Sequence, residues 1–273
     1  MTRRLITHTR QERLDGILEC LMADESASAQ SLAAHFDISL MTVHRDLDEL
    51  QRRGIVRKFR GGVSIERTSS YEIAAALRRR IALPQKLAIG AVAASGVSPG
   101  QVVMLDDSTT ASQMIQYLID IEELRVVTNY LPSLHELSSV TGISVTAIGG
   151  DFDSGHESFV GEGAAKAVRE LRVDALYFST SSADHDGIYH QEEKVVRLKS
   201  EMIRCAGRRI LLMDSSKLGQ TSLHRVGGWD VINELITDDG AAVEVLESIR
   251  AQGVVVRTVP SIDYVDTHEE RKS

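Results

Sequence analysis

The chain has few cysteines and no long apolar segment. Its 273 residues include only Cys20 and Cys205, which lie far apart and without CxxC spacing, so no disulfide framework is expected. No apolar run approaches the roughly 18 residues that a membrane-spanning helix needs. The basic start, MTRRLITHTRQERL, lacks the apolar segment of a signal peptide. These absences predict a protein of the reducing cytoplasm, and the length suits two domains.

Charge is unevenly distributed along the chain. The totals of 31 Lys+Arg and 39 Asp+Glu give a formal net charge of −8, which alone disfavours nucleic acid binding. The first 80 residues, however, hold 14 Lys+Arg against 11 Asp+Glu, a balance of +3. Subtraction leaves 17 against 28 for residues 81–273, a balance of −11. The opposite signs indicate a DNA-binding head on an acidic body.

Residues 28–63 have the layout of a winged helix-turn-helix. An upstream helix is predicted by an apolar stripe at helical spacing, formed by Leu14, Ile17, Leu18 and Leu21. Ser28 is the expected N-cap of a second helix, and Asp37, Ile38 and Ser39 form the turn before a third. The third helix is predicted by the spacing of Val43, Leu47 and Leu50. Such a motif places this helix in the major groove of DNA.

The phasing of the third helix leaves one face outward. Outward residues near the start of such a helix reach base edges, and Arg45 suits a bidentate contact to guanine O6 and N7. The following run, IVRKFRGGVSI, predicts a hairpin with a glycine turn and with cations for phosphates or a minor groove. The residues predicted to bind double-stranded DNA are Ser39, Met41, Thr42, His44, Arg45, Arg57, Lys58 and Arg60.

The second half of the chain alternates between strand-like and helical segments. Short Val/Ile/Leu runs such as VVML, LRVVT, DALYF and RILLM alternate with amphipathic stretches, which predicts a mostly parallel, helix-covered α/β sheet. Ligands of such sheets bind beyond the carboxyl ends of the strands. The predicted division is a winged helix-turn-helix over residues 1–66, a linker helix over 67–84, an effector-sensing domain over 85–260 and a tail over 261–273.

The strand that ends at Leu105 leads into the strongest candidate binding site. Ser108, Thr109 and Thr110 offer hydroxyl and backbone N–H groups where a helix begins, which suits an anion, although helix capping alone explains the same residues. Asp106 and Asp107 suit a phosphate poorly, so they either orient the loop or accept hydrogen bonds from sugar hydroxyls.

Polar residues also end the neighbouring strands. Asn129 faces the same crevice, Gly150 lets the backbone approach a ligand closely, and Lys217 could supply the positive charge that a phosphate needs. The predicted effector site comprises Asp106, Asp107, Ser108, Thr109, Thr110, Asn129, Gly150, Asp214 and Lys217. The run Asp184, His185 and Asp186 lacks a second cluster at ligand spacing. No metal, cofactor or catalytic residue is therefore predicted.

The stretch ISLMTVHRDLDELQRRGIVRKFRGGV resembles the N-terminal signature of the DeoR family of bacterial sugar-metabolism regulators. The resemblance continues in the family's order through LDDSTT (105–110), VVTN (126–129), IGGDFDSGHESFVG (148–161), LLMDSSKLG (211–219) and LITD (235–238). His44 stands where the family usually has Arg, and Ser108 and Ser182 stand where it usually has Gly. The last two departures bear on the identity of the effector.

The resemblance implies both a fold and a function. The sensor is expected to have the Rossmann-like parallel sheet shared with ribose-5-phosphate isomerase, glucosamine-6-phosphate deaminase and CoA transferases. The chain is expected to act as a transcriptional repressor, less often an activator, of a carbohydrate-metabolism operon. Its expected partners are operator DNA, a phosphorylated sugar or polyol effector, and further copies of itself in a homodimer or homotetramer.

Two other functions are compatible with the sequence. A sugar-phosphate isomerase or deaminase with a DNA-binding appendage would need a placed acid and base, and Asp184 is a candidate. A protein-interaction module is the third reading, and the basic hairpin with Arg45 argues against it.

Overall fold

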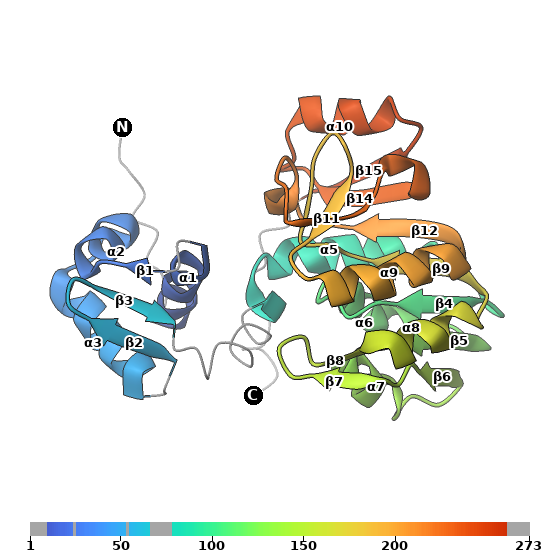
Figure 1. The fold of residues 1–273 in the computed structure, drawn as a ribbon, viewed down its shortest axis with the longest axis horizontal. Helices are drawn as coiled ribbons and strands as arrows, with labels where there is room; N and C mark the ends of the chain where they lie inside the picture. Colours follow the sequence, from blue (N-terminus) through green and yellow to red (C-terminus); the bar gives the residue numbers. More distant parts are fainter. Residues whose placement is uncertain (1–9, 24–25, 53–54, 66–77, 261–273) are drawn as a thin grey trace, which may run out of the picture. The chain divides into compact units, whose positions relative to one another are not determined.

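The computed structural model describes residues 10–23, 26–52, 55–65 and 78–260 (Figure 1). The chain divides into two compact units, residues 1–81 and 82–273, and each is described by itself. The predicted tail, 261–273, and most of the predicted linker helix, 67–84, lie outside the described residues. No helix within the described ranges is long and apolar enough to cross a membrane.

The first unit is a winged helix-turn-helix, as predicted. Its elements are α1 (Arg10–Ala23), β1 (Ser26–Ala27), α2 (Ala29–Phe36), α3 (Leu40–Arg52), β2 (Val56–Phe59) and β3 (Gly62–Ile65). Ser28 caps α2 by accepting a hydrogen bond from the backbone N–H of Ser31, and Asp37 ends α2 in the left-handed conformation. Ser39 Oγ accepts from the backbone N–H of Thr42 at the start of α3 (3.2 Å).

The core of the first unit follows the predicted apolar spacing. All seven residues that defined the two stripes are buried, namely Leu14, Ile17, Leu18, Leu21, Val43, Leu47 and Leu50. The buried Asp46 of α3 accepts from Arg13 of α1, with 2.6 Å between Asp46 Oδ2 and Arg13 Nε, so an ion pair also joins these helices. The antiparallel hairpin of β2 and β3 forms the wing, and β1 pairs with β3. A packed core thus holds α3 and the wing in place.

The second unit is built on a seven-stranded sheet in which all neighbouring strands are parallel. The strands, in sheet order, are β15 (Val255–Val259), β14 (Glu234–Asp238), β12 (Ala206–Leu212), β9 (Val173–Phe178), β4 (Val102–Leu105), β5 (Leu124–Thr128) and β6 (Ile143–Ala147). The predicted α/β parallel-sheet class is confirmed.

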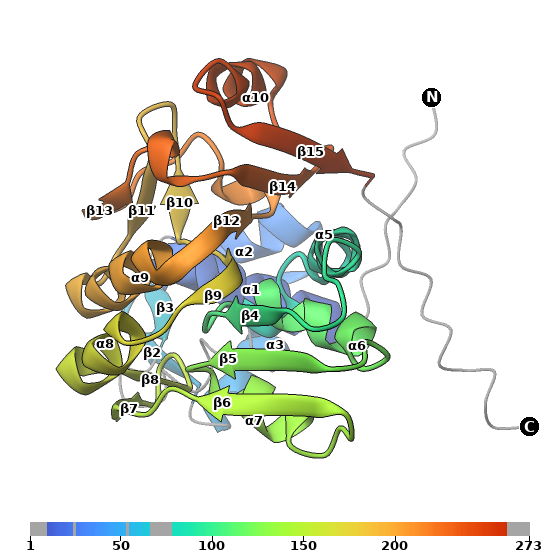
Figure 2. The same ribbon diagram turned by 90° about the vertical axis from the view of Figure 1, so that its right-hand side faces the viewer.

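Helices cover both faces of this sheet. They are α5 (Leu83–Ala94), α6 (Ile115–Leu118), α7 (Leu131–Leu137), α8 (Gly161–Arg169), α9 (Glu193–Cys205) and α10 (Val243–Arg250), with short 3₁₀ turns η1 (Ala111–Met114), η2 (Ser215–Lys217) and η3 (Trp229–Val231). Helices α8 and α9 lie on one face and α5 and α6 on the other (Figure 2). Successive residues of β4 point to opposite faces of the sheet. Met104 packs in the core beneath α8 and α9, and Val103 and Leu105 pack in the core beneath α5 and α6.

Three structural features differ from the sequence-based expectation. The predicted linker helix ends at residue 84, but Pro84 lies in the first turn of α5 and so belongs to the start of the next helix. A hairpin of β7 (Asp151–Asp153) and β8 (Ser158–Val160) follows β6, and β10 (Ser182–Ala183), β11 (Ile188–His190) and β13 (His224–Gly227) form a small antiparallel sheet. These short strands lack an alternating apolar pattern long enough to predict them.

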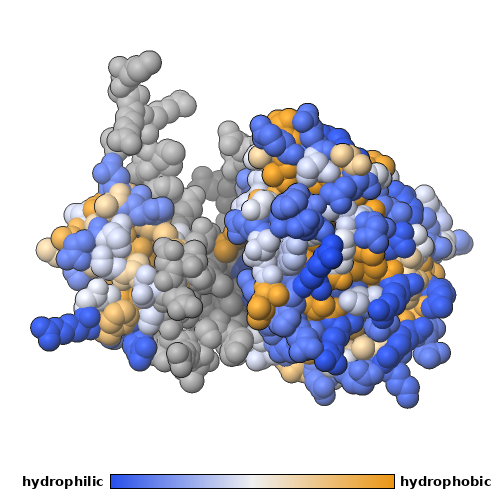
Figure 3. All heavy atoms as spheres, turned by 45° about the horizontal axis from the view of Figure 1, so that its top comes forward, coloured by the Kyte–Doolittle hydropathy of each residue, from blue (hydrophilic) through white to orange (hydrophobic). Residues whose placement is uncertain are grey.

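On the face seen in Figure 3, the sensor unit is mostly hydrophilic with scattered apolar patches.

Candidate functional site

The outward face of α3 carries most of the predicted DNA contacts. Ser39, Met41, His44 and Arg45 are exposed, and Met41 exposes 65% of its surface although it is apolar. Thr42 is half-buried, with its Oγ1 2.9 Å from Ser39 Oγ, so it supports the start of the helix. An exposed guanidinium and an exposed apolar side chain in the first two turns of α3 suit base edges and thymine methyl groups respectively.

The wing carries the remaining predicted cations. Arg57 and Arg60 are exposed, and Gly61, at φ 98°, forms the hairpin turn next to Arg60. Lys58 differs from the two arginines because its Nζ bonds to Asp48 Oδ1 on α3. This hydrogen bond and the charge of Lys58 lower the pKa of the Asp48 carboxyl group. Lys58 therefore ties the wing to α3, and its charge is balanced by Asp48.

The sensor unit gathers polar residues at the carboxyl edge of its sheet. They directly follow or end four neighbouring strands: Asp106–Thr110 after β4, Thr128 and Asn129 at β5, Ser179 and Thr180 after β9, and Asp214 after β12. All of these are buried except Asp107 and Ser108, which are half-buried. The topology thus brings the predicted 106–110 loop and Asn129 to one edge.

A buried cluster of three charges organises this edge. Lys199 of α9 donates to Asp106 Oδ2 and, at 3.1 Å, to Asp107 Oδ1. Asp106 also accepts from the backbone N–H groups of Ser108 and Ser179, each at 3.0 Å, so it joins the loops after β4 and β9. Asp106 has no exposed surface. The geometry therefore favours the loop-orienting role of Asp106 over contact with a ligand.

The pKa values within the cluster follow its burial and its charges. Burial acts to raise the pKa of Asp107, but the ammonium of Lys199 outweighs it and brings that pKa well below the usual range. Burial acts to lower the pKa of Lys199, and the two carboxylates outweigh it and raise that pKa above its usual value. Asp107 and Lys199 are therefore both charged at physiological pH.

Two buried lysines near this edge were not predicted. Lys199 lies on the apolar stripe of α9 with Val195, Leu198 and Met202, and a cation on such a stripe is the signal that would have found it. Lys86, in the first turn of α5, is 2% exposed, and its Nζ lies 3.1 Å from Thr109 Oγ1. Lys86 therefore brings positive charge to the hydroxyl-rich loop.

The hydroxyl loop is only partly explained by helix capping. Ser108 Oγ accepts from the backbone N–H of Ala111 (3.1 Å), the first residue of η1, whereas the N-cap residue Thr110 makes no side-chain capping hydrogen bond. Thr110 Oγ1 and Asn129 Oδ1, however, are buried and make no hydrogen bond to the described residues. A buried polar atom without a partner is costly, so these two oxygens suit a polar ligand.

Gly150 and Lys217, both predicted to lie at the effector site, differ in their surroundings. Gly150 has φ 147°, and a Cβ there would lie 2.5 Å from the carbonyl oxygen of Val160, so glycine lets two backbone segments pack closely. Lys217 Nζ is 3.6 Å from Asp214 Oδ2, and its side chain is 29% exposed. The Lys217 ammonium thus remains accessible from solvent, beside a buried carboxylate.

Histidines and carboxylates form two other groups. Asp184, His185 and Asp186 lie in the turn between β10 and β11, where Asp184 Oδ1 accepts from two backbone N–H groups. Asp153, His156 and Glu192 also come close together, but Lys194 already pairs with both carboxylates.

His190 lies near this second group. Burial, and then the charge of Lys199, lower the pKa of His190 to about 3, so its imidazole is neutral at physiological pH. No catalytic arrangement of an acid and a base follows from these groups.

Family models match both units of the chain. The DeoR-like helix-turn-helix domain matches residues 13–69, and the DeoR C terminal sensor domain matches residues 82–239. The chain belongs to the DeoR family. The resemblance identified from the sequence is therefore confirmed, and the chain is a DNA-binding transcriptional regulator of this family.

Several relatives are similar over almost their whole length. The uncharacterized HTH-type transcriptional regulator YgbI of Escherichia coli is 33% identical over 84% of this chain and 90% of the relative. The transcriptional repressor AccR of Agrobacterium fabrum is 30% identical over 90% of this chain and 95% of the relative. The glycerol-3-phosphate regulon repressor of Escherichia coli is 26% identical over 86% and 94%.

One similar solved structure has a lower sequence identity. A D-ribose-5-phosphate isomerase in complex with phospho-erythronic acid has a TM-score of 0.37 and 14% identity, and covers 49% of this chain and 52% of that chain. A similarity of this size does not establish a shared fold or activity.

Proposed function

We propose that this DeoR-family protein represses a carbohydrate-metabolism operon and that a phosphorylated sugar or polyol relieves the repression. The observation that carries the effector site is the pairing of Lys86 with the Thr109 hydroxyl, beside the unpartnered oxygens of Thr110 and Asn129. The names of two relatives support the proposal, since both are repressors and one regulates a glycerol-3-phosphate regulon.

The residues of the effector site divide by role. Lys86, Thr109, Thr110 and Asn129 contact the ligand, and Lys217 reaches it from the solvent side. The remaining predicted residues hold the site in shape, namely Asp106, Asp107, Ser108, Gly150 and Asp214. Residues 81–273 carry an excess of 11 negative charges. Because this field is screened beyond about 8 Å at physiological salt, local cations and hydroxyl groups can still favour an anion.

We propose that the protein senses this ligand without converting it. The candidate acid or base of the enzyme alternative, Asp184, lies in a hairpin turn, where its carboxylate accepts from the backbone N–H groups of Asp186 and Gly187. A general base needs to reach a proton of the substrate. A panel of sugar phosphates incubated with the protein should therefore show no turnover.

A thermal-shift screen tests the effector class. Glycerol 3-phosphate, ribose 5-phosphate and hexose phosphates are compared with the same compounds without phosphate. A ligand at 100 times its Kd that binds only the folded state should add about 2.7 kcal/mol to the stability. Stabilisation by unphosphorylated sugars alone would contradict the phosphate assignment.

The DNA contact is tested at Arg45. Arg45→Ala should weaken specific operator binding by about 1–3 kcal/mol, because Arg45 is exposed near the start of α3 and suits guanine. Arg60→Ala is the comparison, since a phosphate contact weakens binding to all sequences and reduces the salt dependence. An unchanged affinity and sequence preference for Arg45→Ala would show that α3 does not read the bases.

The same complexes give the number of chains on the operator. We propose a homodimer or homotetramer on repeated half-sites, because one winged helix covers too little DNA to be selective in a genome. Light scattering should show at least two chains per operator. A monomer both free and on DNA would contradict this part of the proposal.

A further inference from the structure

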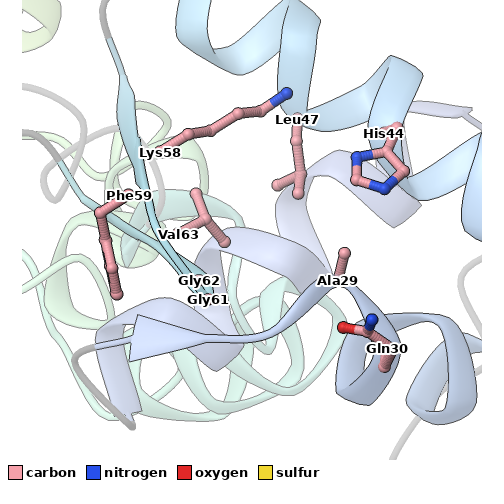
Figure 4. A pocket seen from close by; sticks show the side chains of 9 residues that line it. All are labelled: Ala29, Gln30, His44, Leu47, Lys58, Phe59, Gly61, Gly62 and Val63. Atoms are coloured by element: carbon pink, nitrogen blue, oxygen red, sulfur yellow. The ribbon is translucent and has the colours of Figure 1, made fainter.

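A hollow of about 220 Å³ lies between the start of α2, the middle of α3 and the wing (Figure 4). Its apolar wall is formed by Leu47, Phe59 and Val63, and its polar groups are the side chains of Gln30, His44 and Lys58. Three separate elements of the DNA-binding unit therefore contribute to one open recess.

The positive charge in this hollow depends on His44. Lys58 is paired with Asp48, one turn after His44 on α3, and Lys58 keeps the Asp48 carboxyl group ionised, so that pair has no net charge. From α2 the hollow receives the neutral Gln30. The other described cations of α3 and the wing are exposed and are not among the lining residues: Arg45, Arg52, Arg57 and Arg60. Protonation of His44 thus changes the net charge of the hollow from zero to +1.

We propose that this hollow receives a sugar–phosphate unit of the DNA backbone, and that His44 binds the phosphate as an imidazolium. This inference rests on the DNA-binding function of the unit. The apolar wall suits a deoxyribose ring, and Phe59, which is 47% exposed, is the accessible part of that wall. Gln30 and Lys58 offer N–H donors to the phosphate oxygens.

The consequence is a pH-dependent affinity for DNA. Histidine is the side chain that changes its charge near neutral pH, and an adjacent phosphate favours the charged form. DNA binding then takes up a proton at His44, so the affinity falls as the pH rises. Because the contact is to the backbone, the effect is the same for every DNA sequence.

The experiment measures the affinity of the full chain for a mixed-sequence duplex at constant ionic strength. Between about pH 6 and pH 8.5 the wild type should lose about five- to tenfold in affinity. A loss of this size corresponds to a difference of roughly one pKa unit between the DNA-bound and the free protein at a single group. His44→Arg should bind tightly with little pH dependence, since arginine keeps its charge. His44→Gln should bind weakly with little pH dependence.

A matched control uses the other histidine of the helix-turn-helix. His35 is exposed at the end of α2, outside the hollow, so His35→Gln should keep the wild-type pH profile. A His44→Gln variant that keeps the wild-type profile, or a wild type with pH-independent affinity, would overturn the inference while leaving DNA binding intact. A wild type that binds no duplex at any pH would instead contradict the regulator function itself.

Discussion

Replacing Lys199 by methionine is expected to lower the free energy of unfolding of the sensor unit by about 3–5 kcal/mol. The substitution keeps most of the side-chain volume but leaves Asp106 and Asp107 without their shared cation in a buried setting. Removing one partner from a buried ion cluster destabilises the fold by more than the intact cluster stabilises it, because an uncompensated buried charge remains. The chain has a single tryptophan, and Trp229 is buried in the sensor core, so its fluorescence during urea unfolding follows this unit.

The pH dependence of this variant provides a second readout. In the wild type the pKa of Asp107 is lowered, so its stabilising contribution is present above the usual carboxyl range and is lost as the pH falls. Without Lys199, burial disfavours the carboxylate, and the unfolded chain releases protons more readily than the folded one. The stability deficit of Lys199→Met should therefore shrink as the pH falls towards about 5.

Lys194→Met is the matched control on the same helix. Lys194 pairs with Asp153 and Glu192, but its side chain is 47% exposed. An exposed pair contributes about 0–1 kcal/mol, so this variant should unfold close to the wild type. Equal stability losses in the two variants would show that the buried cluster does not organise the sheet edge.

Replacing Thr109 by valine together with Lys217 by alanine is expected to abolish the response to the effector while keeping operator binding. The first change removes the hydroxyl group that meets Lys86, and the second removes the solvent-side cation of the proposed site. Both residues belong to the sensor unit, so the helix-turn-helix keeps its contacts. The test compares the effector concentration that half-releases the operator from this variant and from the wild type.

The control for this variant replaces an exposed lysine away from the sheet edge. Lys166 lies on α8 and is exposed, so Lys166→Ala removes the same charge without touching the proposed site. The effector concentration that half-releases the operator should be the same for Lys166→Ala as for the wild type. A double variant that also responds at the wild-type concentration would refute the site assignment, whereas one that binds no DNA would show that these residues are structural.

The sequence predicts the elements with strong periodicity. The apolar spacing in α1 and α3 and the turn chemistry at Ser28 and Ser39 define the winged helix before any coordinates are known. The β-α alternation likewise predicts the parallel sheet. The sequence does not predict α5: the predicted linker helix ends at residue 84, whereas Pro84 is a first-turn residue of the next helix.

The contacts of the candidate site are less accessible from sequence. Lys199 and Asp106 are 93 residues apart, and only the packing of α9 against the sheet brings their charges together. Lys86 and Thr109 likewise meet across the contact between α5 and the loop after β4. Local sequence patterns locate the loop of hydroxyl groups, but long-range packing determines which cation lies next to it.

In the proposed function, a phosphorylated ligand at the sheet edge controls operator binding. The most direct test of this control is to titrate the protein–operator complex with a phosphorylated compound that stabilises the protein in the thermal-shift screen. A coupling of about 1–3 kcal/mol between the two sites predicts a loss of operator affinity from several-fold to about a hundredfold. The same operator affinity in the absence and at saturation of that ligand would contradict the account.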